Sequence, residues 1–252
     1  PKTTVATGKI IHDYSMYTSS LKNCLVPLEI IYRNGLPDGS SVFKRLSQGK
    51  ITLKDLGLDH QPKPGETLSK PIFDVSTKLE ETDRYVIWAE AQKIAGLTDS
   101  ELTDIKTVLL KADETITKAA SNAGLKNEDG KIELAFDEKR KLILVDVLGT
   151  LDECRFTYGG VHVSKEVARQ FYKETGWYSD LEKAKKDAEA GGVQDWKSLC
   201  KSKPPKLDPE LKTMISQMYM TVANEMTNIK LFDAPKLDKV INAYRKFMGE
   251  KA

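Results

Sequence analysis

Residues 141–156, KLILVDVLGTLDECRF, decide how this chain of 252 residues is interpreted. Its four apolar residues 142–145 have the composition of a buried strand, and Asp146 follows them directly. A carboxylate therefore lies where a strand leaves the core, which is a common place for a binding site. Farther along, Asp152 and Arg155 offer a hydrogen-bond acceptor and a forked donor on an expected loop.

A second strand is predicted just upstream, at residues 131–136 (KIELAF). The four polar residues 137–140 between the two strands predict a hairpin. In such a pair, Glu133 and Asp146 can face one another. Two carboxylates on neighbouring strands are either solvated surface groups or ligands of a hard divalent cation such as Mg2+. The spacing alone leaves both interpretations open.

Four segments of the chain resemble the SAICAR synthetase family. Residues 142–156 are similar to its signature LxLxDExxTPDSSRFW, and KIELAF is similar to its KFEFG strand. Residues 25–45 (LVPLEIIYRNGLPDGSSVFKR) resemble PLEVIVRNxxxGSxxKR, and residues 71–78 (PIFDVSTK) resemble PIFTPSTK. The matches follow the family's order and extend from Leu25 to about Arg169, which is more than half of the chain.

The chain also departs from the family pattern. Val147 stands where the signature has the glutamate of its DE pair, Leu151 where it has the proline of TPD, and Thr157 where it has the tryptophan of RFW. Family members open with a glycine-rich strand–turn–strand, which only residues 7–9 resemble. The resemblance therefore implies that the N-terminal nucleotide-binding lobe is lacking or diverged.

The expected fold is α+β. The resemblance implies a SAICAR-synthetase-like, ATP-grasp-related antiparallel sheet packed with helices, with the nucleotide between two lobes. It also implies three regions: the remnant or end of an N-terminal lobe (1–24), a catalytic region (25–195) and a helical C-terminal extension (196–252).

Capping and turn signals predict the individual elements. A strand is expected over residues 25–33 and an irregular surface excursion over residues 50–69. Thr98 and Glu101 form a capping box for the longest helix, which should end near Asn122. Further helices are expected at 87–95, at 165–175 after Ser164, from Ser179 to 190, at 211–229 after Asp208, and at 236–248.

Composition restricts the class of protein. The 39 Lys and Arg residues against 37 Asp and Glu residues give a net charge of +2, which does not support nucleic-acid binding. No apolar run reaches the roughly 18 to 20 residues of a membrane span, and no signal peptide is visible. Three widely spaced cysteines favour free thiols in the cytoplasm, and three histidines lack metal-ligand spacing.

The resemblance implies an activity and a catalytic site. SAICAR synthetases use ATP to phosphorylate the carboxylate of carboxyaminoimidazole ribotide, and the amine of L-aspartate then displaces phosphate to give SAICAR. By this resemblance, Lys131, Asp152 and Arg155 are the catalytic residues, and Lys131 also lies next to the nucleotide phosphates. Glu133 and Asp146 are the expected Mg2+ ligands.

Seven further positions are implied to bind substrates: Arg33, Ser40, Ser41, Lys78, Asp83, Lys165 and Arg169. The ribotide phosphate would be held by Arg33 and by Ser40 or Ser41 at the start of a helix. Each position also has a structural interpretation, as a strand-end cation, helix cap, surface ion pair or solvated helix face. Lys44 and Arg45 are expected to be solvated helix charges.

The sequence is compatible with three functions. The first is the ATP-dependent ligase, and the second is a non-catalytic relative that binds ribotide or nucleotide, which Val147, Leu151 and the diverged glycine-rich loop favour. The third is a kinase of a small phosphorylated or polyol substrate. The expected partners are small molecules, and a methionine-bearing helix with Met214, Met218 and Met226 is compatible with a homo-oligomer.

Overall fold

The computed structural model describes residues 2–6 and 9–249, and the chain divides into two compact units. Unit 1 contains residues 2, 12–117 and 127–154. Unit 2 contains residues 3–6, 9–11, 118–126 and 155–249. The sheet that carries the predicted site residues Arg33, Lys131 and Glu133 lies mainly in unit 1.

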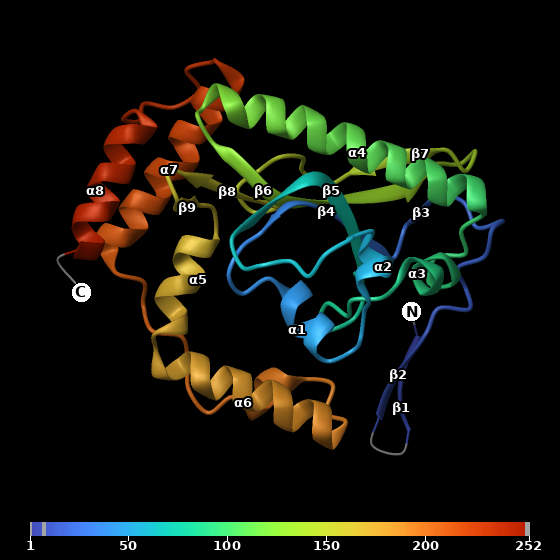
Figure 1. Ribbon diagram of the computed structural model, residues 1–252. Coiled ribbons are helices and arrows are strands. Elements are labelled where there is room, and N and C mark those ends of the chain that lie inside the picture. The colour runs from blue at the N-terminus through green and yellow to red at the C-terminus, as the bar shows by residue number, and fades with distance from the viewer. Residues whose placement is uncertain (1, 7–8, 250–252) are drawn as a thin grey trace. The chain divides into compact units, whose positions relative to one another are not determined.

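An antiparallel sheet forms the centre of unit 1 (Figure 1). Strand β4 (Leu28–Leu36) pairs antiparallel with β5 (Glu66–Thr77) on one side and with β6 (Lys126–Phe136) on the other. Strand β6 also pairs antiparallel with the short strands β3 (Cys24–Leu25) and β7 (Leu142–Val145). The prediction of an α+β fold around an antiparallel sheet is confirmed.

The predicted strand over residues 25–33 is present as two strands, β3 and β4. Pro27 lies between them and has no amide hydrogen to donate to a neighbouring strand. The predicted hairpin of residues 131–145 is confirmed, because β6 and β7 pair antiparallel around the link 137–141.

The prediction that residues 142–145 are buried is wrong. Ile143 and Leu144 are 44% and 41% exposed. Among the described residues, β7 pairs with β6 on one side only. An apolar run predicts burial only where other elements cover both faces of the strand, and a short edge strand lacks that cover.

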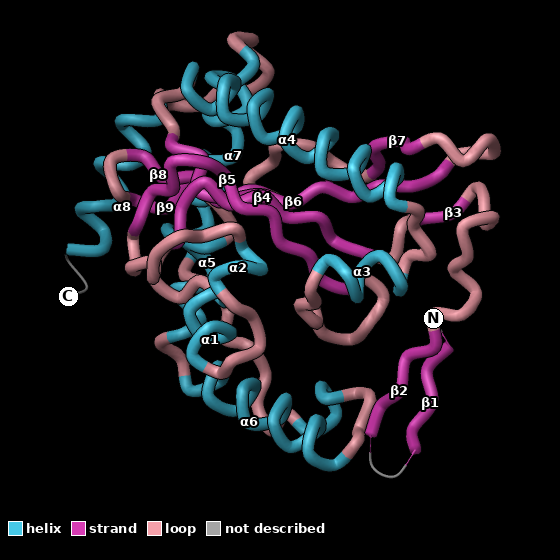
Figure 2. The backbone as a smooth tube through the Cα atoms, turned by 45° about the vertical axis from the view of Figure 1, so that its right-hand side comes forward, coloured by secondary structure: helices cyan, strands magenta, loops and turns pink. Residues whose placement is uncertain are grey.

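Four helices belong to unit 1 wholly or in part: α1 (Ser41–Ser47), α2 (Leu53–Leu56), α3 (Trp88–Ile94) and α4 (Asp99–Asn122). Figures 1 and 2 show α4 along one face of the sheet and α1 and α3 on the other. Helix α4 begins at the predicted capping box, with the Thr98 amide 2.8 Å from Glu101 Oε2. Its apolar stripe, including Ile105 and Leu109, is buried as predicted.

The segment 50–69 is more regular than predicted. Thr52 and Asp55 form a capping box that opens α2, and β5 begins at Glu66. Ile51 and Leu56 are buried in a small apolar core with residues of β4, α1 and β5. The two prolines that indicated irregular structure lie in the link between α2 and β5.

Unit 2 is a hairpin followed by helices. Strands β8 (Cys154–Tyr158) and β9 (Val161–Val163) pair antiparallel around two glycines with positive φ, 53° at Gly159 and 81° at Gly160. The helical elements are α5 (Glu166–Lys173), α6 (Gly176–Gly191), the 3-10 helix η1 (Trp196–Leu199), α7 (Pro209–Thr227) and α8 (Leu237–Gly249). Helix α5 contacts β9 and α6, and α7 packs against α8 (Figure 1).

The predicted helices of unit 2 are present, with one shifted start. Helix α6 begins at Gly176 after Thr175 and not at Ser179, whereas α7 begins after Asp208 as predicted. Met214 and Met218 are 4% and 1% exposed, whereas Met226 is half-buried, and a homo-oligomer stays a prediction. No helix among the described residues is long and apolar enough to cross a membrane.

Near the N-terminus, β1 (Lys2–Ala6) and β2 (Lys9–Asp13) form a two-stranded sheet. The predicted resemblance to a glycine-rich turn falls on residues 7–9, of which residues 7 and 8 lie outside the described residues. Strands β1 and β2 lie on either side of these two residues.

Candidate active site

One face of the unit 1 sheet carries three of the predicted site residues, Arg33, Lys131 and Glu133. Arg33 is opposite Asp129 in the β4–β6 register, and Ile31 is opposite both Lys131 and Asp74. Because side chains alternate between the faces of a sheet, all of these point to one face. That face carries seven polar residues: Glu29, Arg33, Asp74, Ser76, Asp129, Lys131 and Glu133. The opposite face packs on α4, where Asn34 Nδ2 donates to Asp113 Oδ1 at 2.7 Å.

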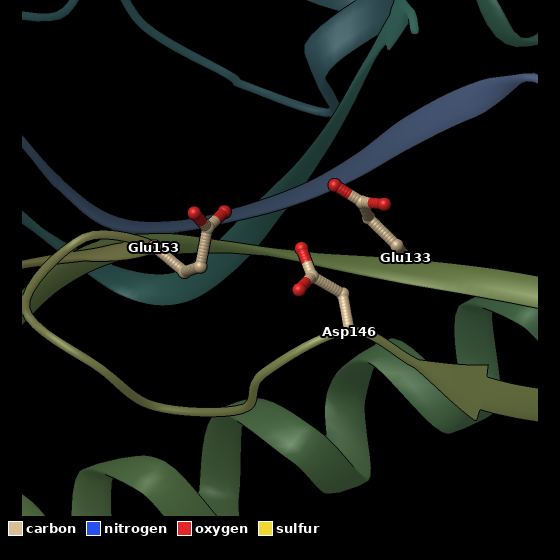
Figure 3. Close-up of side chains that lie close together, drawn as sticks. All are labelled: Glu133, Asp146 and Glu153. Carbon is tan, nitrogen blue, oxygen red and sulfur yellow. The ribbon is translucent and has the colours of Figure 1, made fainter.

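Three carboxylates meet at the end of the β6–β7 pair that is farther from its turn. Oxygens of Glu133, Asp146 and Glu153 all lie within 4.8 Å of one another, and the three side chains face a common space (Figure 3). Glu133 is buried within β6, Asp146 is exposed just after β7, and Glu153 is half-buried just before β8. Carboxylate oxygens are the donors that Mg2+ prefers.

The backbone at Asp146 explains how two of these carboxylates meet. Glu133 is opposite Val145 in the register, so an extended Asp146 would point to the other face of the sheet. Asp146 instead has a φ of 63°, in the left-handed region that aspartate tolerates better than most residues. The strand ends there and the carboxylate turns toward Glu133. The prediction that Glu133 and Asp146 face one another is confirmed, through this turn.

Glu153 reaches the cluster from a tight turn. The amides of Glu153 and Cys154 donate to the Thr150 carbonyl at 3.2 and 2.9 Å, and the Lys131 amide donates to the Glu153 carbonyl at 3.1 Å. The turn reverses the chain after β7, and the last bond fixes Glu153 beside Lys131 of β6. Backbone bonds therefore position this side chain.

Two lysines lie among the carboxylates. Lys131 Nζ is 2.5 Å from Glu29 Oε1, 3.0 Å from Glu153 Oε2 and 3.5 Å from Glu133 Oε1. Lys78 Nζ is 2.5 Å from Glu133 Oε1. Burial acts to lower the pKa of Lys131, but the Glu29 and Glu153 carboxylates outweigh burial and raise that pKa. Lys131 is therefore charged at neutral pH.

The charges of this acidic cluster do not balance. It consists of four carboxylates and two lysines: Glu29, Glu133, Asp146, Glu153, Lys78 and Lys131. When all six are ionised, four negative charges face two positive ones. In addition, Glu153 Oε2 is buried without a hydrogen bond from any described residue, because Lys131 Nζ lies close but outside hydrogen-bond geometry. The donor set and the charge therefore fit one divalent cation.

Arg33 lies in a second, buried network on the same face. Its side chain is 2% exposed, with Nη2 2.9 Å from Asp74 Oδ2 and Nη1 3.1 Å from Asp129 Oδ2. Arg45 also binds Asp74, with Nη1 3.1 Å from Oδ1. The prediction that Arg45 is a solvated helix charge is wrong, because it is 7% exposed and its guanidinium group binds Asp74, whereas Lys44 is exposed as expected.

The two predicted serines begin α1. Ser40 is 3% exposed and caps the helix, with its Oγ accepting from the Val42 amide at 3.4 Å. Ser41 Oγ lies 3.5 Å from Arg33 Nη2. The structure therefore brings Arg33 and Ser41 together, while Ser40 has the role of a helix cap.

The other predicted residues lie at separate positions. Asp83 is exposed in the segment between β5 and α3. Asp152 belongs to unit 1, and Arg155 belongs to β8 in unit 2. Lys165 is the N-cap residue of α5, and the Arg169 amide donates to the Lys165 carbonyl at 3.1 Å.

Within unit 2, Glu166 lies beside these α5 cations. Arg169 Nη1 is 3.6 Å from Glu166 Oε2, and Lys173 Nζ is 2.9 Å from Glu166 Oε1. Burial acts to raise the pKa of Glu166, but Lys173 and then Arg169 outweigh it and lower that pKa. Glu166 therefore forms ion pairs with two cations of α5, Arg169 and Lys173.

Sequence reasoning missed Glu29, Glu153 and Asp74. Glu29 lies in the PLE motif of the segment that resembles the family, and this was the available signal. Glu153 stands where the family signature has the first serine of PDSSR, and Asp74 stands where PIFTPSTK has its first threonine. Each of the last two is a departure from the family pattern that adds a carboxylate.

Comparisons with known proteins agree with these motifs. The SAICAR synthetase family model matches residues 3–187. A protein of Archaeoglobus fulgidus, provisionally named phosphoribosylaminoimidazole-succinocarboxamide synthase, is 44% identical over 94% of this chain and 69% of its own length. The synthase of Thermoplasma volcanium is 34% identical over 82% of this chain and 69% of its own length.

The fold is similar to that of a solved structure. SAICAR synthase from Saccharomyces cerevisiae, complexed with SAICAR, aligns with a TM-score of 0.59 over 83% of this chain and 62% of that chain, at 22% identity. At this identity the likeness shows the fold alone. The chain spans about two thirds of the length of these relatives.

Proposed function

The chain belongs to the SAICAR synthetase family, and we propose that it is the ATP-dependent ligase of purine biosynthesis that joins L-aspartate to carboxyaminoimidazole ribotide. The products are SAICAR, ADP and phosphate. The observation that carries this proposal is the acidic cluster, because its carboxylates and lysines lie on segments that resemble the family's signature. The cluster also has the charge and donor atoms that fit Mg2+.

The reaction needs an activated carboxylate, because a carboxylate oxygen is a poor leaving group. Transfer of the γ-phosphoryl group of ATP to the ribotide carboxylate gives an acyl phosphate and ADP. The aspartate nitrogen then attacks the acyl carbon, the carbon–oxygen bond breaks, phosphate leaves and the nitrogen loses a proton. All reactants are anionic, so the protein must position them and offset their charge.

Glu133 and Asp146 are the proposed Mg2+ ligands. When bound, Mg2+ would neutralise charge on the nucleotide phosphates during phosphoryl transfer. Lys131 is proposed to bind the nucleotide phosphates and Lys78 a substrate carboxylate. In support, the ammonium groups of both lysines contact Glu133, so the residues assigned to metal and to anions are neighbours.

The ribotide phosphate is assigned to Arg33 with Ser40 and Ser41. The supporting contact is Ser41 Oγ, 3.5 Å from Arg33 Nη2, which places a hydroxyl and a cation together at the start of α1. Asp74 and Asp129 hold the guanidinium from two sides and fix its direction. These two carboxylates also weaken the net attraction for a phosphate.

The remaining assignments rest on the family pattern. Asp152 and Arg155 are proposed to orient the ribotide and aspartate, and Asp83, Lys165 and Arg169 to contact substrates. Residues 25–195 are the proposed catalytic region, after the end of an N-terminal lobe in 1–24 and before a helical extension in 196–252. A cytoplasmic location accords with three free cysteines.

The test is phosphate release from ATP in the presence of Mg2+ and carboxyaminoimidazole ribotide, with and without L-aspartate. The ligase predicts release that depends on both ribotide and aspartate. Release of ADP without aspartate, with phosphate retained in the product, would identify a kinase instead. Ribotide binding by calorimetry without any ADP formed would identify a non-catalytic relative.

A further inference from the structure

We propose that Glu153 supplies the third carboxylate of the divalent-cation site, in place of the carboxylate that the family signature carries at position 147. The inference rests on the proposed function, because that function places Mg2+ at Glu133 and Asp146. It adds a residue that this chain has where the signature has a serine.

Glu153 lies beside both proposed Mg2+ ligands. Its carboxylate lies within 4.8 Å of both Glu133 and Asp146, although the three residues belong to different parts of the chain (Figure 3). The turn at Thr150 and the backbone bond to Lys131 hold it there. A donor fixed by the backbone loses little conformational freedom when it binds a cation.

One carboxylate oxygen of Glu153 lacks a hydrogen-bond donor in the part of the chain that the structure describes. The Glu153 side chain is only 13% exposed, and its buried Oε2 accepts no hydrogen bond from the described residues. A buried carboxylate oxygen without a donor is unfavourable unless a cation compensates it. Lys131 Nζ gives partial compensation at 3.0 Å, and it is shared with Glu29 and Glu133. A cation between the three carboxylates would satisfy this oxygen directly.

The signature segment of this chain has as many acidic residues as the family pattern. The family pattern DExxTPDSSR has three acids, and the corresponding residues of this chain also have three: Asp146, Asp152 and Glu153. The acid lost at position 147 reappears at position 153. Val147 is 49% exposed and offers no ligand atom, whereas Glu153 lies in the cluster.

A purely structural role for Glu153 is the alternative, as one of the counter-ions of Lys131. Glu29 provides a matched control for this alternative. It also binds Lys131, at 2.5 Å, but it is not one of the three carboxylates whose oxygens lie within 4.8 Å of one another. Loss of Glu29 therefore removes a lysine partner and leaves the proposed metal donors in place.

The experiment measures Mn2+ binding to the purified protein without nucleotide, by the electron paramagnetic resonance signal of free Mn2+. Wild type is compared with Glu153→Gln, with Glu153→Ser, which restores the signature residue, and with Glu29→Gln and Asp146→Asn. Both Glu153 variants are expected to bind Mn2+ about tenfold or more weakly, and Glu29→Gln is expected to have a clearly smaller effect, because it removes a nearby negative charge but no ligand atom. Circular dichroism melting tests whether each variant is folded.

Three results would overturn the proposal. If the Glu153 variants bind Mn2+ as tightly as wild type while Asp146→Asn does not, Glu153 is a counter-ion of Lys131 only. If Glu29→Gln weakens binding as much as Glu153→Gln, the effect acts through Lys131. Wild type that binds no Mn2+ also overturns the proposal, and aspartate-dependent phosphate release then shows whether the proposed function stands without it.

Discussion

Two charged clusters on the same face of the unit 1 sheet differ in how their charges are balanced. The buried cluster has two arginines and two carboxylates, Arg33, Arg45, Asp74 and Asp129, and each of these residues is at most 7% exposed. The acidic cluster has two lysines and four carboxylates, and it includes the exposed Asp146. Strand β6 contributes to both, through Asp129 to the first and through Lys131 and Glu133 to the second.

The difference indicates different roles. Buried charges that satisfy one another hold strands and helix α1 in place, and removing one of them leaves its partners unpaired. Accessible carboxylates in excess over their cations are suited to bind a cation from solution. By this reasoning the buried cluster is the scaffold of the site, and the acidic cluster is its reactive part. Substitutions of the carboxylates should therefore affect mainly stability in the first cluster and mainly activity in the second.

The largest effect on stability is expected from Asp74→Ala. This change leaves the Arg33 and Arg45 guanidinium groups buried without their shared carboxylate, which should cost about 3–5 kcal/mol of the free energy of unfolding. Asp146→Asn in the acidic cluster should change it by about 0.5 kcal/mol at most. Urea unfolding followed by circular dichroism measures both. Equal losses in the two variants would remove the distinction between the clusters.

The largest effect on activity is expected from the same Asp146→Asn variant. Asparagine also tolerates the left-handed conformation at φ 63°, so the backbone should be kept while the charge is lost. Aspartate-dependent phosphate release should fall about 100-fold or more, the scale seen when a group that stabilises transition-state charge is removed. Full turnover in this variant would show that the metal assignment is wrong.

A smaller effect on stability is expected from Gly130→Ala, which tests the opposite face of the sheet. A Cβ on Gly130 would lie 2.6 Å from Tyr32 Cζ, and the buried ring cannot move away. Overpacking of this kind typically costs about 1–3 kcal/mol. Mn2+ affinity should stay within about twofold of wild type, because this face carries none of the proposed ligands. Loss of affinity together with stability would show that the two faces are coupled.

How much the sequence could predict depended on the range of the interactions. The strand pair and the approach of Glu133 to Asp146 were predictable, because a strand ending in a carboxylate is a local pattern. The burial of Arg45 was not, because its partner Asp74 lies on a strand 29 residues away, and a helix surface charge has the same local sequence. The exposure of Leu144 depends likewise on which elements cover β7. Glu153 was visible only as a departure from the family signature.

The smallest effect concerns an ion pair outside both clusters, Glu101 with Arg140. Burial acts to raise the pKa of Glu101, but Arg140, 2.6 Å away, and the Thr98 amide outweigh it and lower that pKa. The pair therefore stabilises the fold above the unfolded pKa of about 4.3, and this contribution is lost as pH falls through the lower folded pKa. Glu101→Gln should cost about 1 kcal/mol or less at pH 7. Its urea unfolding curve should approach that of wild type at about pH 3, where Glu101 of the wild type becomes protonated. If the free energies of unfolding of the variant and wild type differ equally at both pH values, Glu101 acts through packing. Balanced ion pairs outside the buried cluster then contribute little through their charge.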